Sequence, residues 1–217
     1  TLLTRKNCHR LAEMNCAVGV SLDGVQSANN LRHFPDGTPS FEATVQGIRN
    51  LGDAGKRCNL TTVVTNTNAK DLGKLPDLAL WLGNVSGVGL DLFRPLGRGC
   101  GLDLAPAEAD LCDGLTELIR KTKEIQSAGI PFRLRELERL KKRIACSGCS
   151  DIYCYAQTEQ SLCVDAAGNC WPCSSLTGKA GFLLGNIRNG LPEISCAAAS
   201  IKPTDTCKKC SFFPYCV

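Results

Sequence analysis

Paired cysteines are the residues of this chain whose type and spacing could do chemistry. Three pairs with two intervening residues lie in its last third: Cys146/Cys149, Cys170/Cys173 and Cys207/Cys210. Two cysteines at this spacing deliver two thiolates from a single turn, and converging thiolates bind iron–sulfur clusters or zinc. The spacing favours iron–sulfur clusters, while structural zinc and disulfide bonds remain open alternatives at this point.

The number of cysteines argues against a scaffold made only of disulfides. The chain has 15 cysteines, an odd number spread along its length, so at least one sulfur cannot be paired. Disulfide scaffolds are typically short secreted chains, and residues 1–10 are polar and show no apolar export segment. We therefore expect a cytoplasmic protein.

Composition excludes two classes of partner. Lys and Arg number 25 against 21 acidic residues, a net charge of +4 that is too small to indicate nucleic-acid binding. The longest apolar runs are far shorter than the roughly 20 residues of a membrane span. With 217 residues, the chain can form one large domain or two small ones.

The first two thirds of the chain alternate between short apolar runs and amphipathic stretches. Strands are predicted over 17–22, 60–65 and 88–93, and helices follow them over 40–55, 71–82 and 106–128. Ser40 is predicted to cap the first of these helices and Gly55 to end it. Strands separated by helices pair in parallel, which predicts an α/β layer or part of a barrel.

Polar residues follow each predicted strand, at the end where ligands bind in α/β folds. They are Ser21, Asp23 and Gly24 after the first strand, Asn66 after the second and Arg94 after the third. Asp-Gly is also a common turn pair, so this pattern alone is weak evidence for a site.

The segment Val18 to Gly24, followed by Leu31-Arg32, Asp36-Gly37 and Ser40-Phe41, resembles the middle of the radical S-adenosylmethionine barrel. The cysteine-rich region resembles the SPASM extension that follows this barrel in peptide- and protein-modifying members. Its family pattern is matched at these positions: Cys154, Gly168, Cys173, Cys207, Cys210 and Cys216. The resemblance covers nearly the whole chain.

The resemblance implies two parts. Residues 1–145 would be the C-terminal part of a (β/α) barrel with a linking helix, and residues 146–217 a truncated SPASM domain. The family's CxxxCxxC triad is absent from this sequence, as are the last two cysteines of the SPASM pattern. We therefore expect a fragment of a larger enzyme that is inactive alone.

By the same resemblance, two auxiliary 4Fe–4S clusters would each take three ligands from this chain. They are Cys149 (or Cys146), Cys154 and Cys173 for one cluster, and Cys207, Cys210 and Cys216 for the other. Gly168 permits a positive-φ turn close to a crowded site. Cys163 is expected to be a small apolar residue on a strand face.

The resemblance also implies a binding site for S-adenosylmethionine (AdoMet). Ser21 and Arg32 match positions that face the methionyl carboxylate and amine, with Asp23 in the same motif, and a guanidinium suits a carboxylate. Leu92 and Phe93 could line the adenine pocket, although a core role is an equal alternative. Reductive cleavage of AdoMet would give a 5′-deoxyadenosyl radical that abstracts hydrogen from a substrate residue.

SPASM members mostly modify peptides or proteins, by thioether or carbon–carbon crosslinks or by side-chain oxidation. Such enzymes need a reductant such as flavodoxin or ferredoxin. Sulfatase-maturating members carry an aspartate directly after the cysteine equivalent to Cys173, where this chain has Ser174. This difference favours peptide maturation, with sulfatase maturation as an alternative. A non-catalytic electron-transfer module and a zinc-binding module are the remaining alternatives.

The basic run from Arg133 to Arg143 is predicted to be the solvated face of a linking helix. Leu134, Leu137 and Leu140 would then face inward. Contact of this run with an acidic peptide is the alternative.

Overall fold

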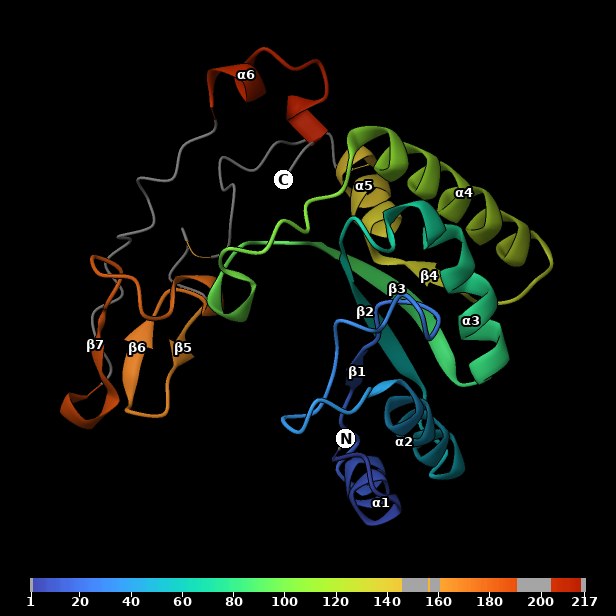
Figure 1. The fold of residues 1–217 in the computed structure, drawn as a ribbon, viewed down its shortest axis with the longest axis horizontal. Coiled ribbons are helices and arrows are strands. Elements are labelled where there is room, and N and C mark those ends of the chain that lie inside the picture. Colours follow the sequence, from blue (N-terminus) through green and yellow to red (C-terminus); the bar gives the residue numbers. More distant parts are fainter. Residues whose placement is uncertain (1, 146–155, 157–160, 191–203, 216–217) are drawn as a thin grey trace. The chain divides into compact units, whose positions relative to one another are not determined.

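The structure is a computed structural model that describes residues 2–145, 156, 161–190 and 204–215 (Figure 1). The chain divides into two compact units, Thr1–Arg139 and Leu140–Val217. The division falls within helix α5 (Arg135–Ala145), close to the boundary expected after residue 145. That expected domain boundary stays a prediction.

A parallel sheet forms the centre of the first unit. Its strands follow the order of the sequence: β1 (Val18–Ser21), β2 (Cys58–Val64), β3 (Val85–Leu92) and β4 (Arg133–Leu134). Each neighbouring pair is parallel, with Val20 opposite Leu60 and Leu60 opposite Val88. The predicted α/β class and parallel pairing are therefore confirmed.

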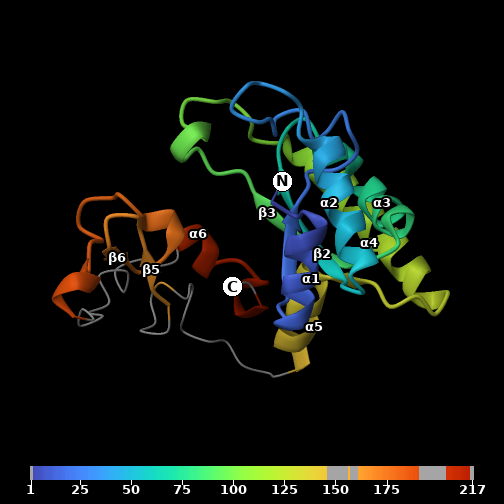
Figure 2. The ribbon, with the colours of Figure 1, turned by 90° about the horizontal axis from the view of Figure 1, so that it is seen from below.

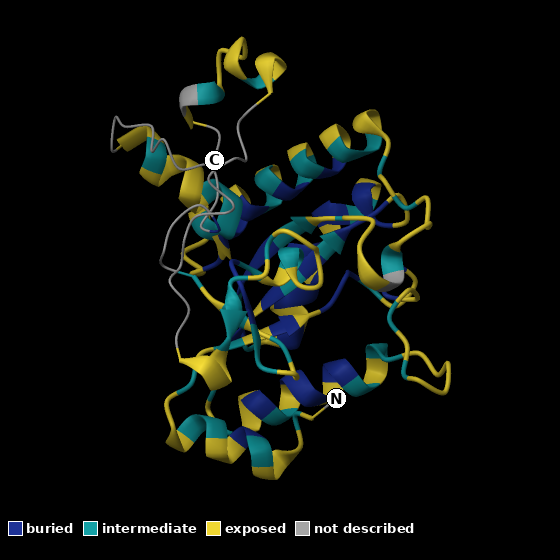
Figure 3. Ribbon diagram, turned by 90° about the vertical axis from the view of Figure 1, so that its left-hand side faces the viewer, coloured by how far each residue is buried: buried dark blue, intermediate teal, exposed yellow. Residues whose placement is uncertain are grey.

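Helices connect the strands and pack against one face of the sheet. They are α1 (Arg5–Glu13), α2 (Phe41–Asp53), a 3₁₀ helix (Ala69–Lys74), α3 (Leu75–Leu82) and α4 (Glu108–Ser127). Figures 1 and 2 show α2, α3 and α4 along the same side of the sheet. Buried residues of the strands and helices form the hydrophobic core, and Figure 3 shows dark blue segments on both.

Local sequence explains most of the helix ends. Pro76 lies in the first turn of α3, where its missing N–H costs nothing, and Gly55 follows α2 at a positive φ of 71°. Ser40 stands at the cap position of α2, but its hydroxyl donates to the carbonyl of Arg32 at 2.9 Å. Ser40 therefore takes the predicted cap position, but its side chain holds the preceding loop and does not cap the helix.

The opposite face of the sheet carries small and polar residues, and we call it the polar face. Because paired residues of parallel strands point to the same side, its members follow from the register: Gly19, Ser21, Asn59, Thr61, Val63, Gly87, Gly89 and Asp91. Ser21 and Asn59 are exposed, and Thr61 and Asp91 are partly exposed. This face therefore presents polar groups to solvent at Ser21 and Asn59.

The helix predicted from Arg133 differs from the observed structure. Arg133 and Leu134 form β4, and the helix α5 begins at Arg135. Leu134 is buried and Leu137 packs against the core, as predicted, but Leu140 is 42% exposed. The inward orientation predicted for Leu140 is wrong, since the core contact of this helix ends within its first turn.

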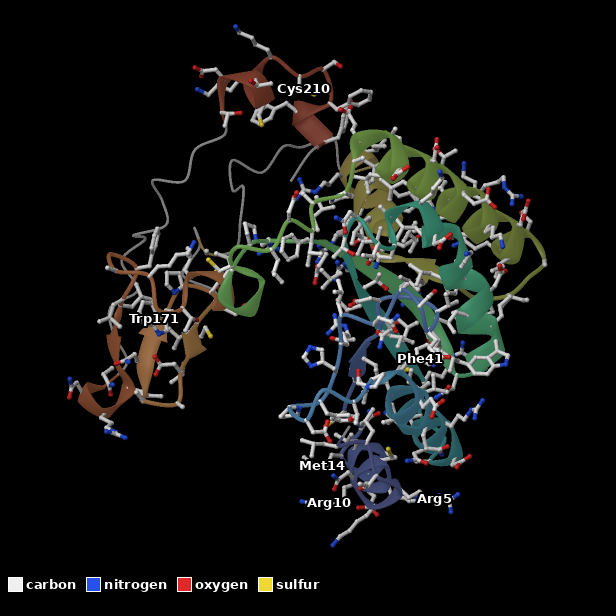
Figure 4. The ribbon with its side chains drawn as sticks, viewed as in Figure 1. Arg5, Arg10, Met14, Phe41, Trp171 and Cys210 are labelled. Carbon is white, nitrogen blue, oxygen red and sulfur yellow. The ribbon has the colours of Figure 1, made fainter. Side chains whose placement is uncertain are left out.

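The second unit contains a three-stranded antiparallel sheet of β5 (Cys163–Val164), β6 (Asn169–Trp171) and β7 (Gly185–Asn186). The short helix α6 (Asp205–Lys208) follows later in the chain. Figure 4 labels Trp171 on β6 and Cys210 just beyond α6. Within the described ranges, no helix is long and apolar enough to cross a membrane.

One carboxylate organises the hairpin between β5 and β6. Asp165 accepts hydrogen bonds from the backbone N–H groups of Ala167 and Asn169 at 2.9 and 3.0 Å, and from the indole N–H of Trp171 at 3.2 Å. Hydrogen bonds from Asn169, together with those from Trp171 and Ala167, hold the pKa of Asp165 below its usual value. Gly168 has a φ of 86°, so the predicted positive-φ turn is confirmed.

Candidate functional site

A guanidinium–carboxylate pair lies just beyond the carboxyl end of β1. Arg32 donates from Nε to Asp23 Oδ2 at 2.6 Å and from Nη2 to Asp23 Oδ1 at 2.8 Å. This two-point geometry fixes the plane of the guanidinium as well as its position. The Asp23 side chain is 8% exposed and that of Arg32 is 31% exposed, so the arginine faces outward from a buried anchor.

Backbone and amide groups fix the anchor in turn. Asp23 Oδ1 also accepts from the backbone N–H of Val63 at 2.8 Å, which connects the loop after β1 to β2. The amide of Asn68 donates to the carbonyls of Asp23 and Val63 at 2.9 and 2.8 Å, and its oxygen accepts from Thr65 N–H. The carboxyl ends of β1 and β2 are thereby held as one rigid unit.

The loop that carries Arg32 contains a side-chain hydrogen-bond donor with no partner among the described residues. Asn29 is buried and its side-chain oxygen accepts from Asp23 N–H at 3.1 Å, but its Nδ2 has no hydrogen-bond partner among the described residues. Ser21 is exposed at the last position of β1. Ser21 is an exposed donor, Arg32 a partly exposed donor and Asn29 Nδ2 a buried donor, and each is of a type from which a carboxylate accepts hydrogen bonds.

The residues at the carboxyl ends of β2 and β3 are an exposed apolar side chain and groups that hold a loop. Leu92, the last residue of β3, is 59% exposed, so a plain core role is excluded for its side chain in the described structure. Asn66 donates its side-chain amide to the carbonyl of Asp103 at 3.0 Å and its backbone N–H to the carbonyl of Leu104 at 2.9 Å, so it holds the loop after β3. Arg94 is exposed in the same loop.

A second guanidinium–carboxylate pair lies on the polar face near the end of β3. Arg135 donates from Nη2 to Asp91 Oδ1 at 2.9 Å and from Nε to Glu136 Oε1 at 2.8 Å. Burial lowers the pKa of Arg135, but its hydrogen bonds and attraction to Glu136 and Asp91 outweigh burial and raise that pKa. Arg135 is therefore charged throughout the physiological range.

The predicted cluster ligands are only partly within the described ranges. Cys173 follows β6, Cys207 lies in α6 and Cys210 just after it, whereas Cys146, Cys149, Cys154 and Cys216 lie outside those ranges. In the described part of the chain, no three His, Cys, Asp or Glu residues gather as a metal site, and every cysteine is a free thiol. The cluster assignments and the zinc alternative stay predictions.

Two cysteines with no predicted ligand role lie in described strands of the second unit. Cys170 is fully buried in β6. Cys163, on β5, is half-buried with its sulfur 3.6 Å from the hydroxyl of Thr177. Cys163 does lie on a strand, as predicted, although it contacts a polar group.

Sequence reasoning missed three residues that shape this region: Asn68, Arg135 and Glu136. Asn68 lies in the polar run after β2, where an Asn that bonds its own backbone is typical. Arg135 alternates with Leu134 in the short strand pattern Arg-Leu-Arg, a signal that the helical periodicity of the following residues obscured.

Comparison with solved structures places the whole chain on a known fold. Native anSMEcpe with bound AdoMet, an anaerobic sulfatase-maturating enzyme, superposes with a TM-score of 0.82 at 22% identity, covering 99% of this chain and 62% of that one. SuiB of Streptococcus suis bound to S-adenosylmethionine gives 0.66 at 14% identity, covering 100% and 52%. The chain has the fold of these proteins.

Two sequence relatives match smaller parts of the chain than these structures do. An uncharacterized protein of Methanocaldococcus jannaschii is 28% identical over 189 residues, which are 87% of this chain and 59% of that protein. A serine-type anaerobic sulfatase-maturating enzyme of Bacteroides thetaiotaomicron is 41% identical over 71 residues, 32% of this chain and 17% of that one. No protein-family profile matches the chain. The chain thus spans about three fifths, or less, of the length of these proteins.

Proposed function

We propose that this chain is part of a radical S-adenosylmethionine enzyme of the SPASM type that modifies a peptide or protein. The observation that carries the proposal is the Asp23–Arg32 pair at the carboxyl end of β1, in a chain whose fold matches AdoMet-bound structures. Peptide complexes of anSMEcpe with Kp18Cys and of SuiB with its precursor peptide SuiA support a peptide as the substrate class.

The residues at the ends of the strands fit AdoMet chemically. In this proposal Arg32 binds the methionyl carboxylate, Asp23 orients the guanidinium, and Ser21 donates its hydroxyl to the same end of the cofactor. Leu92 offers an exposed apolar side chain to the adenine. The buried, unpartnered Nδ2 of Asn29 supports a missing acceptor beside this pair, because an unsatisfied buried donor costs about 1–3 kcal/mol.

Bound AdoMet and a 4Fe–4S cluster would supply the radical chemistry of such an enzyme. The chain's own contribution is to bind and orient. Cys173, Cys207 and Cys210, with the cysteines outside the described ranges, would hold the auxiliary clusters, and a flavodoxin or ferredoxin would supply electrons.

Sulfatase maturation is the second candidate. Its support is the similarity to two sulfatase-maturating enzymes, one of which is 41% identical over 71 residues. Ser174 argues against it, because the resemblance implies an aspartate at this position in that branch. A sulfatase-derived peptide carrying a serine or cysteine at the modified position distinguishes the two, since only a maturating enzyme converts it to formylglycine.

The test uses the full-length protein, purified and reconstituted anaerobically with iron and sulfide. We expect acid-labile sulfide and iron in proportion, and release of 5′-deoxyadenosine and methionine from AdoMet on addition of dithionite, detected by mass spectrometry. Arg32→Gln should bind AdoMet at least tenfold more weakly, with unchanged iron content. Stoichiometric zinc without iron, or iron without any 5′-deoxyadenosine, would overturn the proposal.

A further inference from the structure

The fourth strand ends before the third does. In β4, Arg133 lies opposite Gly87 and Leu134 lies opposite Val88. The helix α5 then begins at Arg135 with no intervening loop, although β3 continues to Leu92. A continued strand would have placed residues 135 and 136 opposite Gly89 and Leu90, where they would bond the backbone of β3.

Side chains make these bonds instead. Glu136 Oε1 accepts from the backbone N–H of Leu90 at 3.1 Å, and Arg135 Nη2 donates to the carbonyl of Leu90. The backbone N–H and C=O of Leu90 are therefore both hydrogen-bonded to adjacent residues of α5. Arg135 Nε donates to Glu136 Oε1, which locks the two side chains together as one unit.

Glycine at position 89 makes room for this arrangement. A Cβ on Gly89 would lie 2.7 Å from Arg135 Cζ and 2.8 Å from its Nε, closer than side chains approach. The guanidinium thus lies directly on the polar face of β3, and from there it also reaches Asp91. A strand residue with a side chain would not fit at position 89, because the Arg135 guanidinium occupies that space.

We infer that Arg135 and Glu136 are positioning residues that replace the missing strand and hold the carboxyl end of β3, including Leu92, in place for the adenosyl end of AdoMet. The inference rests on the proposed function, which assigns AdoMet to these strand ends. Because hydrogen bonds to charged groups contribute more than neutral ones, a side-chain pair can fix a strand end that has lost its neighbour on one side.

Binding of two ligands tests the inference in the full-length protein, reconstituted anaerobically. AdoMet carries both the adenosyl group and the methionyl carboxylate, whereas 5′-deoxyadenosine carries only the former. We expect Arg135→Ala and Glu136→Ala to weaken both ligands by the same factor, about tenfold. Glu136→Gln, which keeps an acceptor for Leu90 N–H, should stay within about twofold of wild type. Arg32→Gln should weaken AdoMet alone.

The outcomes separate the inference from the proposed function. If wild-type protein binds AdoMet but Arg135→Ala and Glu136→Ala leave 5′-deoxyadenosine affinity unchanged, the positioning role is wrong and the function stands. If Glu136→Gln loses as much affinity as Glu136→Ala, the acceptor role is wrong. If wild-type protein binds neither ligand, the proposed function fails. Circular dichroism spectra and melting curves of each variant show whether it is folded.

Discussion

Two guanidinium–carboxylate pairs lie at the ends of the parallel strands, and they differ in burial. Asp23 is 8% exposed and accepts hydrogen bonds from two nitrogens of Arg32 and from the backbone N–H of Val63. Asp91 is 46% exposed and accepts one nitrogen of Arg135, whose other bonds go to Leu90 and Glu136. In the first pair the carboxylate is the fixed member, and in the second the guanidinium is.

This difference suggests a division of labour. A buried carboxylate that holds an outward arginine leaves that arginine available to an anion. An arginine that lies on the sheet and bonds a backbone carbonyl is committed to the fold. The first pair therefore suits direct contact with a ligand, and the second suits positioning of a strand, although both consist of the same two residue types.

The largest difference in stability between the two pairs should appear when each carboxylate is removed. Asp23→Ala leaves a buried N–H and a partly buried guanidinium without partners, and we expect a loss of about 3 kcal/mol in the free energy of unfolding. Asp91→Ala should cost below about 1 kcal/mol, because Asp91 is 46% exposed and accepts one hydrogen bond from Arg135. Urea unfolding measures both. Asp23→Asn, which keeps one acceptor, is the matched control and should fall between them.

Equal losses for the two alanine variants would contradict the comparison. So would a larger loss for Asp91→Ala than for Asp23→Ala.

Substitution of two glycines on the polar face should give a smaller difference in stability. Gly89→Ala must displace the Arg135 guanidinium and its bonds to β3, so we expect a loss of about 1–2 kcal/mol. A Cβ on Gly19 meets no described atom within 4 Å, and Gly19→Ala should be neutral or stabilising by about 0.5 kcal/mol. Thermal melting of both variants measures the contrast. A Gly89→Ala protein as stable as Gly19→Ala would show that Arg135 does not depend on this space.

The smallest effect concerns salt. Coupling energies from double-mutant cycles isolate each pair. Between about 0.05 and 1 M NaCl, the Asp91–Arg135 coupling should fall by about 0.5 kcal/mol, because exposed charges are screened. The Asp23–Arg32 coupling should change less. A steeper salt dependence for the buried pair would reverse the assignment of roles.

Sequence reasoning names both members of the local pair as site residues, without predicting their contact, but neither member of the distant pair. Asp23 and Arg32 are nine residues apart in one loop, so a motif can contain both. Asp91 and Arg135 are 44 residues apart and meet only because β4 pairs with β3. Periodicity located the first three strands well, since their apolar runs are long. It missed the two-residue β4, because such a short strand is defined by its partner and not by its own pattern.

The candidate site shows the same limit. Ser21, Asp23 and Leu92 were expected at strand ends, and the structure places them there. The burial of Asp23 and its bond to Val63 were not foreseeable, because they depend on register with β2. Sequence assigned Arg135 to a solvated helix face, since charged residues at helical spacing usually are solvated.

The most direct test of the central claim is an anaerobic crystal structure of the full-length protein with AdoMet. We expect the cofactor to lie on the polar face at the carboxyl ends of β1–β3, with its carboxylate within hydrogen-bond distance of Arg32. The adenine should lie beside Leu92. AdoMet bound elsewhere, or bound with its carboxylate away from Arg32, would contradict the account.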